Sequence, residues 1–512
     1  MAILNSLMSW YLKKRINNIE RFMLRPADVQ EEVLLTLIQK AQDTEWGRAH
    51  NYSSISTSEQ FKREVPVGNY ESHQPWIERV MKGEQNLLWP SEIKWFAKSS
   101  GTTSAKSKFI PVTYESLDEC HFQGGKDAML MYFNNNPDST VFDGKGLILG
   151  GSHQLNKFSS ESYYGDLSAV MMQNMPFWAQ FFRTPDLNIA IMENWDDKLE
   201  KMANATIHDD VTSISGVPTW TLMLAERVLE LTGKRTLKEV WPNLELYVHG
   251  GVSFTPYRQR FSQVIGSEGM HYLETYNASE GFIGIQDDLN SENMLLMLDY
   301  GIYYEFMPMS EYGKTHPKTY SIDEVKLNEQ YALIISTNAG LWRYIIGDTI
   351  RFTSINPFRF KISGRTKHYI NAFGEELIIE NADHAIQETC RRLNIHITDY
   401  TAAPVFHHDK SVGTHEWLIE FVDCTLDEDT IIDVLDEELK KCNSDYEAKR
   451  YNNIAMTKPL LHKLPKNTFN RWLRQKDKLG GQHKVPRLYN DRTYVDEILL
   501  MTHQKNRAYE AY

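Results

Sequence analysis

The sequence predicts a mixed α/β protein with more than one domain, and three observations support this class. The chain has 512 residues, whereas a single hydrophobic core stops growing at about 250 to 300 residues. Hydrophobic residues make up 41% and charged residues 24% of the chain, a balance typical of globular proteins rather than disordered ones. Helical periodicity and strand-like alternation are mixed throughout, without an internal repeat or a low-complexity tract.

The N-terminal residues 1–24 have an amphipathic pattern that predicts a helix. Asn5 and Ser9 interrupt its apolar positions, and the basic residues 13–15 follow them instead of preceding them, so we do not expect a signal peptide. The apolar runs of the chain are all shorter than the ~18 residues of a membrane span. Contact with a membrane surface stays open as an alternative, but we expect this helix to pack against its own domain.

Short apolar runs bounded by turn residues predict strands, and apolar residues at helical spacing predict helices. Strands are expected at residues 93–97, 109–112, 146–149, 244–248, 302–306 and 331–337. Helices are expected at residues 31–44, 219–231, 382–393 and 426–442. Because the two kinds of element alternate along the chain, they support the α/β class.

A domain boundary is expected near residue 364. Between Gly340 and Ile370 several short strand-like pieces are separated by turn residues, and residues 364–367 are suited to a compact hinge. We therefore expect a large N-terminal domain at residues 1–363, a hinge at 364–368 and a C-terminal domain at 369–512. The last of these is long enough for one small α+β domain.

The charge of the chain argues against a nucleic-acid partner. The formal net charge is −13, and such a surface repels the phosphates that supply most non-specific nucleic-acid affinity. Residues 458–487 run against this average, because Asp477 is their only acid among nine basic residues. Two interpretations stay open for this stretch, a solvated face and a local positive field that attracts polyphosphate.

Cysteine usage predicts a reducing compartment. The chain has only four cysteines, without a CxxC pair, so a disulfide framework is not expected. A cytoplasmic location fits this pattern best. The four cysteines are Cys120, Cys390, Cys424 and Cys442.

A hydroxyl-rich segment at residues 98–108 is the first candidate for binding a ligand. It lies between two expected strands and combines serine and threonine hydroxyls with a glycine and three lysines, which together suit a triphosphate. It is not a Walker A loop, because the required spacing and the following helix are missing. A solvated turn is the alternative.

An acidic turn at residues 274–281 is the second candidate. Glu280 lies just before the apolar run 282–285, at an expected junction between a loop and a strand. Mg²⁺ prefers one or two carboxylates together with substrate phosphates, so Glu280 is suited to hold it. A solvated glutamate is the alternative.

A third segment, residues 340–349, ends on Gly347 and Asp348. An acid that follows a glycine at the end of an apolar run can accept hydrogen bonds from both ribose hydroxyls of a nucleotide. An aspartate that only caps a turn is the alternative.

A fourth segment, residues 480–487, places Lys484 on a loop that begins with two glycines. A cation delivered to the α-phosphate of a nucleotide would neutralise charge that develops only in the transition state. An ordinary surface lysine is the alternative.

The order and spacing of these four segments resemble the auxin-responsive-promoter family of acyl acid amido synthetases. This family is a branch of the adenylate-forming superfamily, which includes acyl-CoA ligases and luciferases. Lesser matches are the sequences at 215–218, 241–243, 304–306 and 363–365, so the resemblance extends from about residue 95 to about residue 490. It implies a large adenylate-forming domain with several β-sheets flanked by helices, followed by a smaller, mobile α+β C-terminal domain.

The resemblance also implies a role for each matching residue. Tyr276 would lie near the adenine and Asp348 would hold the ribose, while Glu280 would bind magnesium and Lys484 would be the mobile catalytic lysine. The other residues implied to contact the nucleotide are Ser99, Ser100, Gly101, Thr102, Thr103, Lys108, Gly250, Gly251 and Ser279. An acyl pocket is inferred from family position and side-chain character at Val217, Thr219, Trp220 and Phe254.

The implied reaction uses ATP and Mg²⁺. A small-molecule carboxylic acid would be activated as an acyl-adenylate, and the acyl group would pass to an amine with release of AMP. An acyl-CoA ligase is the alternative, because its first half-reaction is identical. A nucleotide-responsive binding protein with a decayed site is a third hypothesis, against which Glu280, Asp348 and Lys484 argue. The sequence contains no GxSxG elbow, no HExxH motif and no zinc-type Cys/His cluster.

Overall fold

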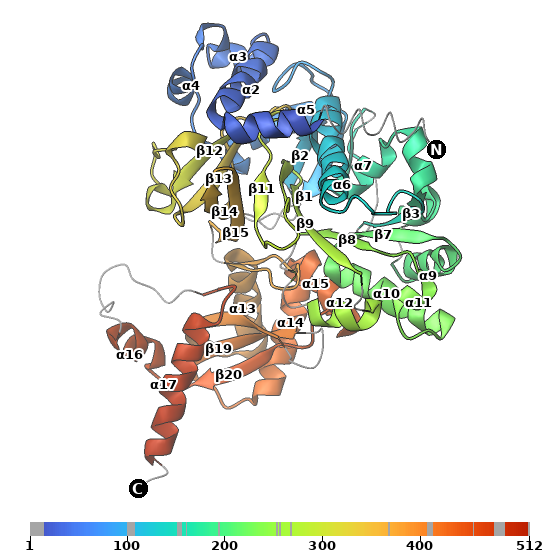
Figure 1. Ribbon diagram of the computed structural model, residues 1–512. Helices are drawn as coiled ribbons and strands as arrows, with labels where there is room; N and C mark the ends of the chain where they lie inside the picture. Colours follow the sequence, from blue (N-terminus) through green and yellow to red (C-terminus); the bar gives the residue numbers. More distant parts are fainter. Residues whose placement is uncertain are drawn as a thin grey trace. The chain divides into compact units, whose positions relative to one another are not determined.

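The computed structural model (Figure 1) describes residues 15–99, 108–150, 156–159, 161–192, 195–251, 254, 258–266, 269–366, 369–406, 413–453, 455–475 and 487–509. The chain divides into two compact units. The described residues within 1–99, 108–251 and 261–366 form the larger unit, and the other described residues form the smaller one.

An 11-stranded sheet forms the centre of the larger unit, with the strand order β12-β13-β14-β15-β11-β10-β9-β8-β7-β3-β6. Strands β9, β8, β7, β3 and β6 are parallel neighbours, whereas the pairs from β12 to β9 are antiparallel. The strand bounds are β3 (Lys145–Leu149), β6 (Arg183–Thr184), β7 (Val211–Gly216), β8 (Leu246–Gly250), β9 (His271–Ala278), β10 (Gly281–Ile285), β11 (Met294–Leu296), β12 (Ile302–Pro308), β13 (Gln330–Thr337), β14 (Tyr344–Ile355) and β15 (Phe358–Arg365).

A separate 4-stranded sheet has the order β2-β1-β5-β4. It consists of β1 (Trp95–Ser99), β2 (Lys108–Val112), β4 (Asn156–Lys157) and β5 (Tyr163–Gly165). Strands β1 and β2 are antiparallel, while β1 and β5 are parallel. Ser99 pairs with Lys108, so both ends of the hydroxyl-rich segment are fixed by one strand pair.

Helices surround these sheets, and several begin at the caps that the sequence provides. Thr44 and Thr57 accept backbone N–H groups at the starts of α3 and α4, and Asn69 forms a capping box with Ser72 at α5. The helices are α2 (Pro26–Ala41), α3 (Glu45–Ala49), α4 (Ser58–Glu64), α5 (Tyr70–Met81), α6 (Gln123–Asn135), α7 (Leu167–Gln173), α8 (Leu187–Ala190), α9 (Trp195–Thr206), α10 (Pro218–Thr232), α11 (Leu237–Val240) and α12 (Arg258–Ile265), with the π-helix η2 (Ser116–Phe122) and the 3-10 helices η1 (Tyr52–Ser54), η3 (Phe177–Phe182), η4 (Met309–Glu311) and η5 (Ile322–Glu324).

The smaller unit has its own hydrophobic core, centred on the fully buried Trp417 of β19. Its three-stranded sheet has the order β18-β19-β20, and a two-stranded sheet pairs β16 with β17. The elements are β16 (Tyr369–Ile370), β17 (Leu377–Ile378), β18 (His396–Phe406), β19 (Gly413–Asp423), β20 (Leu460–Leu464), α13 (Ile379–Leu393), α14 (Glu428–Cys442), α15 (Ser444–Arg450), α16 (Thr468–Gln475), α17 (Thr493–Tyr509) and η6 (Tyr451–Asn453).

The N-terminal helix is described from residue 15 to residue 24. Ile19 and Phe22 are buried in the core of the larger unit, and Arg15 forms ion pairs with Asp127 and Asp299. The prediction that this helix packs against its own domain is therefore confirmed for these residues. None of the described helices combines the length and the apolar character that a membrane crossing requires.

The predicted strands and helices are present among the described residues, but β1 and β8 each begin two residues later than expected, and two differences are larger. The helix expected at residues 31–44 begins at Pro26 and ends at Ala41, because Pro26 provides a first helical turn and Thr44 already caps α3. The several short pieces expected between residues 340 and 370 are wrong, since two long strands, β14 and β15, form a hairpin there. The described fold confirms the predicted α/β class.

Two lysines of the basic stretch form ion pairs with acidic residues. The Lys458 ammonium lies 2.8 Å from Asp433, and that of Lys466 lies 2.9 Å from Asp423. These pairs are exposed, as a solvated face requires. Residues 476–486, which include Lys484, lie outside the described residues.

Candidate functional site

Two of the predicted nucleotide residues meet directly in the structure. The Tyr276 hydroxyl on β9 donates a hydrogen bond to the Asp348 carboxylate on β14. Strands β15, β11 and β10 separate β14 from β9 in the sheet, so the sheet must curl to bring these side chains together. The Tyr276 ring also lies 6.3 Å from the ring of Phe360 on β15. Both Tyr276 and Asp348 are 7% exposed.

Asp348 is placed by an irregularity in its strand. The pairing between β13 and β14 shifts register between Ala332 and Ile334, so extra residues of β14 lie opposite Leu333. Gly347, immediately before Asp348, has a φ of +105°, a conformation that L side chains rarely adopt. A bulge of this kind redirects the next side chain, which explains why a glycine precedes this aspartate.

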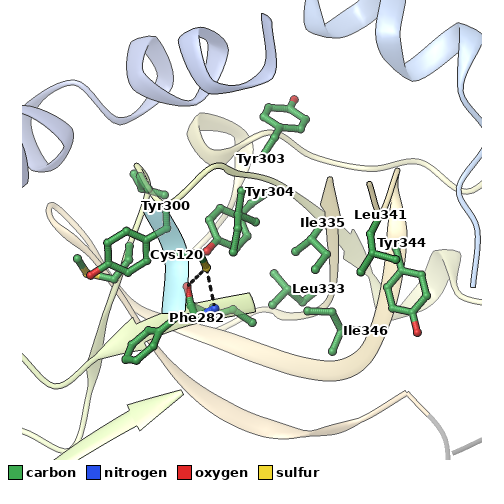
Figure 2. Close-up of a cluster of buried hydrophobic side chains, with 14 of the residues drawn as sticks. Cys120, Phe282, Tyr300, Tyr303, Tyr304, Leu333, Ile335, Leu341, Tyr344 and Ile346 are labelled. Carbon is green, nitrogen blue, oxygen red and sulfur yellow. Dashed lines mark hydrogen bonds between the residues drawn. The ribbon is translucent and has the colours of Figure 1, made fainter. Parts of the chain in front are cut away.

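The turn between β9 and β10 carries Ser279 and Glu280, and Glu280 is 8% exposed. The π-helix η2 supports this turn at two points. The His121 Nδ1 atom lies 2.8 Å from Asn277 Oδ1, and the Phe282 N–H donates to the Cys120 sulfur over 3.1 Å. Figure 2 shows the Cys120–Phe282 contact within an aromatic and aliphatic core.

Burial lowers the pKa of His121 to about 4, and the hydrogen bond with Asn277 only partly offsets this. His121 is therefore neutral at physiological pH. A neutral, fully packed histidine provides a rigid support for the segment that carries Glu280.

The hydroxyl-rich loop is described only at its two ends, because Ser100, Gly101, Thr102 and Thr103 lie outside the described residues. Ser99 closes β1, and Lys108 opens β2 with 6% of its surface exposed. The Lys108 ammonium lies 5.8 Å from the centre of the Tyr70 ring on α5. The Tyr70 hydroxyl accepts the Phe109 N–H over 3.0 Å, which fixes this end of the loop.

The segment before α5 connects the hydroxyl-rich loop to the strand of Asp348. The Gly68 N–H donates to the Arg343 carbonyl over 2.9 Å, and the Ile345 N–H donates to the Gly68 carbonyl over 2.8 Å. The start of β2, the start of α5 and β14 therefore form one continuous set of contacts. The structure thus brings together the described parts of three of the four predicted segments.

Gly250 ends β8 and Gly251 follows it, and the two have different structural reasons to be glycine. A Cβ atom on Gly250 would lie 2.3 Å from the Thr275 carbonyl oxygen, so the close approach of β9 requires a glycine. Gly251 has a φ of +81°, and a Cβ atom there would meet only Val217, at 3.8 Å. Strand packing and backbone conformation therefore account for these glycines in the structure.

Of the predicted acyl-pocket residues, Val217 and Trp220 are partly buried at the start of α10. Thr219 lies in the same helix, but its side chain is outside the described part of the structure. Phe254 is 4% exposed, and the Arg258 guanidinium lies 5.5 Å above its ring. Val217 follows β7, so it lies at the carboxyl edge of the parallel strands, where α/β sheets bind ligands.

A buried ion pair accounts for two further sequence matches. The Arg343 guanidinium binds both carboxylate oxygens of Glu305, over 2.8 and 2.7 Å. It also donates to the backbone carbonyls of Lys62 and Val65. These contacts hold β14 to β12 and to the segment before α5, so Arg343 and Glu305 belong to the scaffold of the site.

Two ionisable residues near the site were not predicted from the sequence. Asp166 follows β5, and Lys198 is a fully buried residue of α9 whose ammonium donates to the Gly150 carbonyl over 3.1 Å. Neither residue belongs to a recognisable motif. The only sequence signal is a charged residue next to an expected strand end or within an apolar helix face.

Comparisons with known proteins show related sequences and the same fold. Indole-3-acetic acid-amido synthetase GH3.4 from Arabidopsis thaliana is 22% identical over 468 residues, which cover 76% of this chain and 76% of that protein. Jasmonoyl--L-amino acid synthetase JAR4 from Nicotiana attenuata is 22% identical over 402 residues, covering 65% of this chain and 68% of that protein.

Two solved structures share the fold at low sequence identity. The acyl acid amido synthetase AtGH3.15 in complex with 2,4-DB has a TM-score of 0.61 at 18% identity, covering 96% of both chains. A 2-hydroxyisobutyryl-CoA ligase in complex with 2-HIB-AMP and CoA has a TM-score of 0.56 at 12% identity, covering 94% of this chain and 93% of that chain. These likenesses confirm the predicted fold, which contains a large unit with several sheets and a smaller α+β unit.

Three family domains match the sequence in consecutive order. They are the GH3 family N-terminal domain at residues 15–270, the GH3 family central domain at residues 295–365 and the GH3 family C-terminal domain at residues 380–493. Together they cover most of the chain, and the resemblance to acyl acid amido synthetases is thereby confirmed. The chain belongs to the GH3 family.

Proposed function

We propose that this protein is an ATP-dependent acyl acid amido synthetase. It would join a small-molecule carboxylic acid to an amine, such as an amino acid, with release of AMP and pyrophosphate. The relatives named above are an indole-3-acetic acid-amido synthetase and a jasmonoyl-amino acid synthetase, and family membership extends this reaction class to the present chain. The acid substrate of this chain is a separate question from the acids in those two names.

The observation that carries this proposal is the meeting of Tyr276 and Asp348. These residues come from two separate predicted segments, and their side chains touch at a curled part of the sheet. An aspartate with one oxygen held by a tyrosine is well placed to present its carboxylate to the two hydroxyls of a ribose. The tyrosine ring then provides a flat surface beside that position, as an adenine requires.

The first step is attack of the substrate carboxylate on the α-phosphorus of ATP, which displaces pyrophosphate. The hydroxyls at residues 99–103 and the Lys108 ammonium would hold the phosphates. Glu280 would hold Mg²⁺, since one partly buried carboxylate plus phosphate oxygens matches the donor set that this ion prefers. When bound, Mg²⁺ would neutralise phosphate charge.

The second step is attack of the amine on the acyl-adenylate carbonyl, which releases AMP. No covalent enzyme intermediate is required. In this proposal Lys484 would reach the α-phosphate during the first step, carried by a C-terminal domain at residues 369–512 that turns about a hinge at 364–368. The presence of two compact units supports such a division of labour.

The acyl pocket would be lined by Val217, Thr219, Trp220 and Phe254. The apolar and aromatic character of these side chains favours an apolar or aromatic acid. All four cysteines are free thiols, which supports a reducing, cytoplasmic location.

ATP–pyrophosphate exchange across a panel of carboxylic acids tests the proposal. We expect exchange that depends on one group of apolar or aromatic acids and on Mg²⁺, followed by amide formation when amino acids are added. Background exchange with every acid would contradict adenylation. Product formation with coenzyme A and none with amines would identify an acyl-CoA ligase, the alternative with the same first step.

Replacing Lys484 tests its assigned role. Lys484→Ala should slow adenylation by ~10² to 10³, the usual effect of losing one charge partner in the transition state. ATP binding, measured by titration calorimetry, should stay nearly unchanged. An equal loss in binding and in rate would show that Lys484 holds the ground state instead.

A further inference from the structure

Asp166 occupies a position that the proposed reaction leaves without a role. Strands β1 and β5 are parallel, with Ala97 opposite Gly165. Lys98, the next residue of β1, and Asp166, which follows β5, therefore lie side by side. Lys98 leads into the hydroxyl-rich loop, so Asp166 lies at the entrance of the segment assigned to phosphate. Its carboxylate forms no side-chain cap bond with the helix α7 that follows.

Lys198 is a second basic residue that acts electrostatically on Asp166. It is 0% exposed, and its ammonium donates to the carbonyl of Gly150, which follows β3. Leu149 of β3 pairs with Gly216 of β7, and Val217 comes next. Lys198 therefore lies at the same carboxyl edge of the sheet as the expected acyl pocket. Asp166 interacts electrostatically with Lys98 and with Lys198. Lys98 precedes the loop assigned to phosphate, and Lys198 lies at the sheet edge of the expected acyl pocket.

Burial raises the pKa of Asp166 to about 6, although Lys98 and Lys198 both lower it. Burial likewise lowers the pKa of Lys198 to about 8, against the effect of Asp166. An acid with a pKa just below neutral pH is ionised in the cell and still basic enough to accept a proton. A buried acid of this kind beside a reaction centre is a typical general base.

The second half-reaction requires such a base. An aliphatic amine or an amino acid is an ammonium ion at neutral pH, and its nitrogen has no electron pair for attack until one proton leaves. We propose that Asp166 takes this proton from the acceptor ammonium, which rests on the proposed function of the chain as an amide-forming synthetase. Lys98 and Lys198 are positioning residues that keep the carboxylate ionised between turnovers.

The proposed proton transfer precedes formation of the amide bond. The ammonium N–H bond breaks, its proton moves to an Asp166 carboxylate oxygen, and the nitrogen lone pair forms the C–N bond with the acyl carbonyl carbon. The C–O bond to the phosphate then breaks, and AMP leaves with that electron pair. The second proton of the attacking nitrogen passes to solvent, and Asp166 returns its own proton to solvent before the next turnover.

The test compares three rates in wild type and Asp166→Asn at pH 8. These are pyrophosphate exchange, amide formation with an amino acid, and hydroxamate formation with hydroxylamine, which is uncharged at this pH and needs no base. Amide formation should fall by about 10² to 10⁴, the usual contribution of a general base. Exchange and hydroxamate formation should stay near the wild-type rates.

The pH dependence supplies a readout that a merely structural role would not change. In wild type, amide formation should rise through about pH 6, where Asp166 loses its proton. In Asp166→Asn, the rate should instead keep climbing toward the pKa of the acceptor itself, so the deficit should shrink at high pH. Lys198→Met removes a cation that lowers the Asp166 pKa and should move the wild-type rise to higher pH.

Asp186 offers a matched control. It is an exposed aspartate at the start of α8, with φ −56° and ψ 155° against −58° and 149° for Asp166, and it also makes no cap bond. Asp186→Asn should leave all three rates unchanged. Asp166→Glu keeps a carboxylate at the site and should recover part of the amide rate if Asp166→Asn proves poorly folded.

Two results would overturn the assignment of Asp166. One is an amide rate that is unchanged in Asp166→Asn. The other is an equal loss of exchange, hydroxamate and amide formation without recovery in Asp166→Glu, which would place Asp166 in adenylation or folding. Absence of exchange in wild type with every acid would overturn the proposed function itself, together with this assignment.

Discussion

Arg343 and Asp348 belong to the same short stretch of chain, and both are buried charges, yet their surroundings differ. Arg343 is enclosed by protein groups, with a bidentate ion pair to Glu305 and bonds to two backbone carbonyls. Asp348 is approached by the neutral hydroxyl of Tyr276 and is oriented by a bulge at Gly347. The first arrangement holds strands together, while the second presents a carboxylate.

Arg343 and Asp348 therefore represent two kinds of residue within the segment 340–349. A charge that protein partners fully satisfy contributes to the scaffold, and its loss leaves the opposite charge buried without a partner. A carboxylate that a tyrosine hydroxyl and a strand bulge orient is the group that we assign to the nucleotide. Variants of the first kind should change stability, whereas variants of the second kind should change nucleotide binding.

The largest expected effect is on stability, for a variant of Arg343. Arg343→Met should lower the free energy of unfolding by about 3 to 5 kcal/mol, because Glu305 stays buried without its partner. Urea unfolding followed by circular dichroism measures this loss. The KM for ATP of the remaining folded protein should be close to that of wild type.

Two variants serve as controls for Arg343. Arg351→Met removes an exposed arginine of β14, the strand that follows Arg343, and should change stability by less than about 0.5 kcal/mol. The double variant Arg343→Met, Glu305→Leu removes both charges and should recover much of the stability. A double variant as unstable as the single one would mean that backbone contacts of Arg343, not its ion pair, hold β14.

Acid pH should lower the free energy of unfolding through two buried histidines, His121 and His73. Burial lowers the pKa of His121, beside the Glu280 turn, and of His73, which accepts the Trp342 N–H, to about 4 in each case. The unfolded chain, with histidine pKa values near 6.5, binds protons more readily between these limits. Stability should therefore fall as pH drops from about 6.5 to about 4, by on the order of 2 to 4 kcal/mol per histidine.

Urea unfolding at several pH values checks this effect. His121→Gln and His73→Gln should each flatten the pH dependence between pH 4 and pH 6.5, at some cost in stability near neutral pH. His316→Gln, at an exposed position, should leave the slope unchanged. A slope that stays the same in the two buried variants would show that other groups cause the acid sensitivity.

A smaller effect is expected on ATP binding, for variants of Asp348. Asp348→Ala should raise the KM for ATP by roughly 10-fold to 100-fold, since hydrogen bonds to a charged group contribute about 1.5 to 3 kcal/mol. The turnover number should fall less than the affinity. Steady-state kinetics with varied ATP measures both values.

Asp348→Asn refines this prediction, because it keeps an acceptor for Tyr276 while it removes the charge. Its stability should stay near wild type while the KM for ATP still rises. Asp323→Ala, at an exposed position of η5, is the matched control. An unchanged KM in both Asp348 variants would count against a ribose contact.

The smallest effect is expected for Tyr276→Phe. This change removes only the hydroxyl that orients Asp348, so stability should fall by about 1 kcal/mol. The KM for ATP should rise, but by less than in Asp348→Ala. A larger rise than in Asp348→Ala would show that the tyrosine hydroxyl contacts the nucleotide itself.

Local patterns predicted part of the individual elements. Residues 302–306 and 331–337 are mostly apolar, and both proved to be buried strands. Strands β4 and β5 were missed, because Asn156–Lys157 and Tyr163–Gly165 are too short and too polar to show a pattern. Their pairing depends on β1, which comes much earlier in the chain.

Long-range contacts are what the sequence alone could not provide. Tyr276 and Asp348 were both named as nucleotide residues, but their contact depends on the order and curl of the sheet. Asp166 and Lys198 escaped notice because their significance arises from burial next to strand ends, not from a motif. The glycine at position 250 was expected to contact the nucleotide, whereas the nearby Thr275 carbonyl already requires a glycine there.

A crystal structure with bound ATP tests the central claim most directly. We predict the ribose hydroxyls within hydrogen-bond distance of the Asp348 carboxylate, the adenine beside Tyr276 and the phosphates toward the loop that Ser99 and Lys108 delimit. A nucleotide bound elsewhere, with Asp348 and Tyr276 still paired and remote from it, would contradict this account.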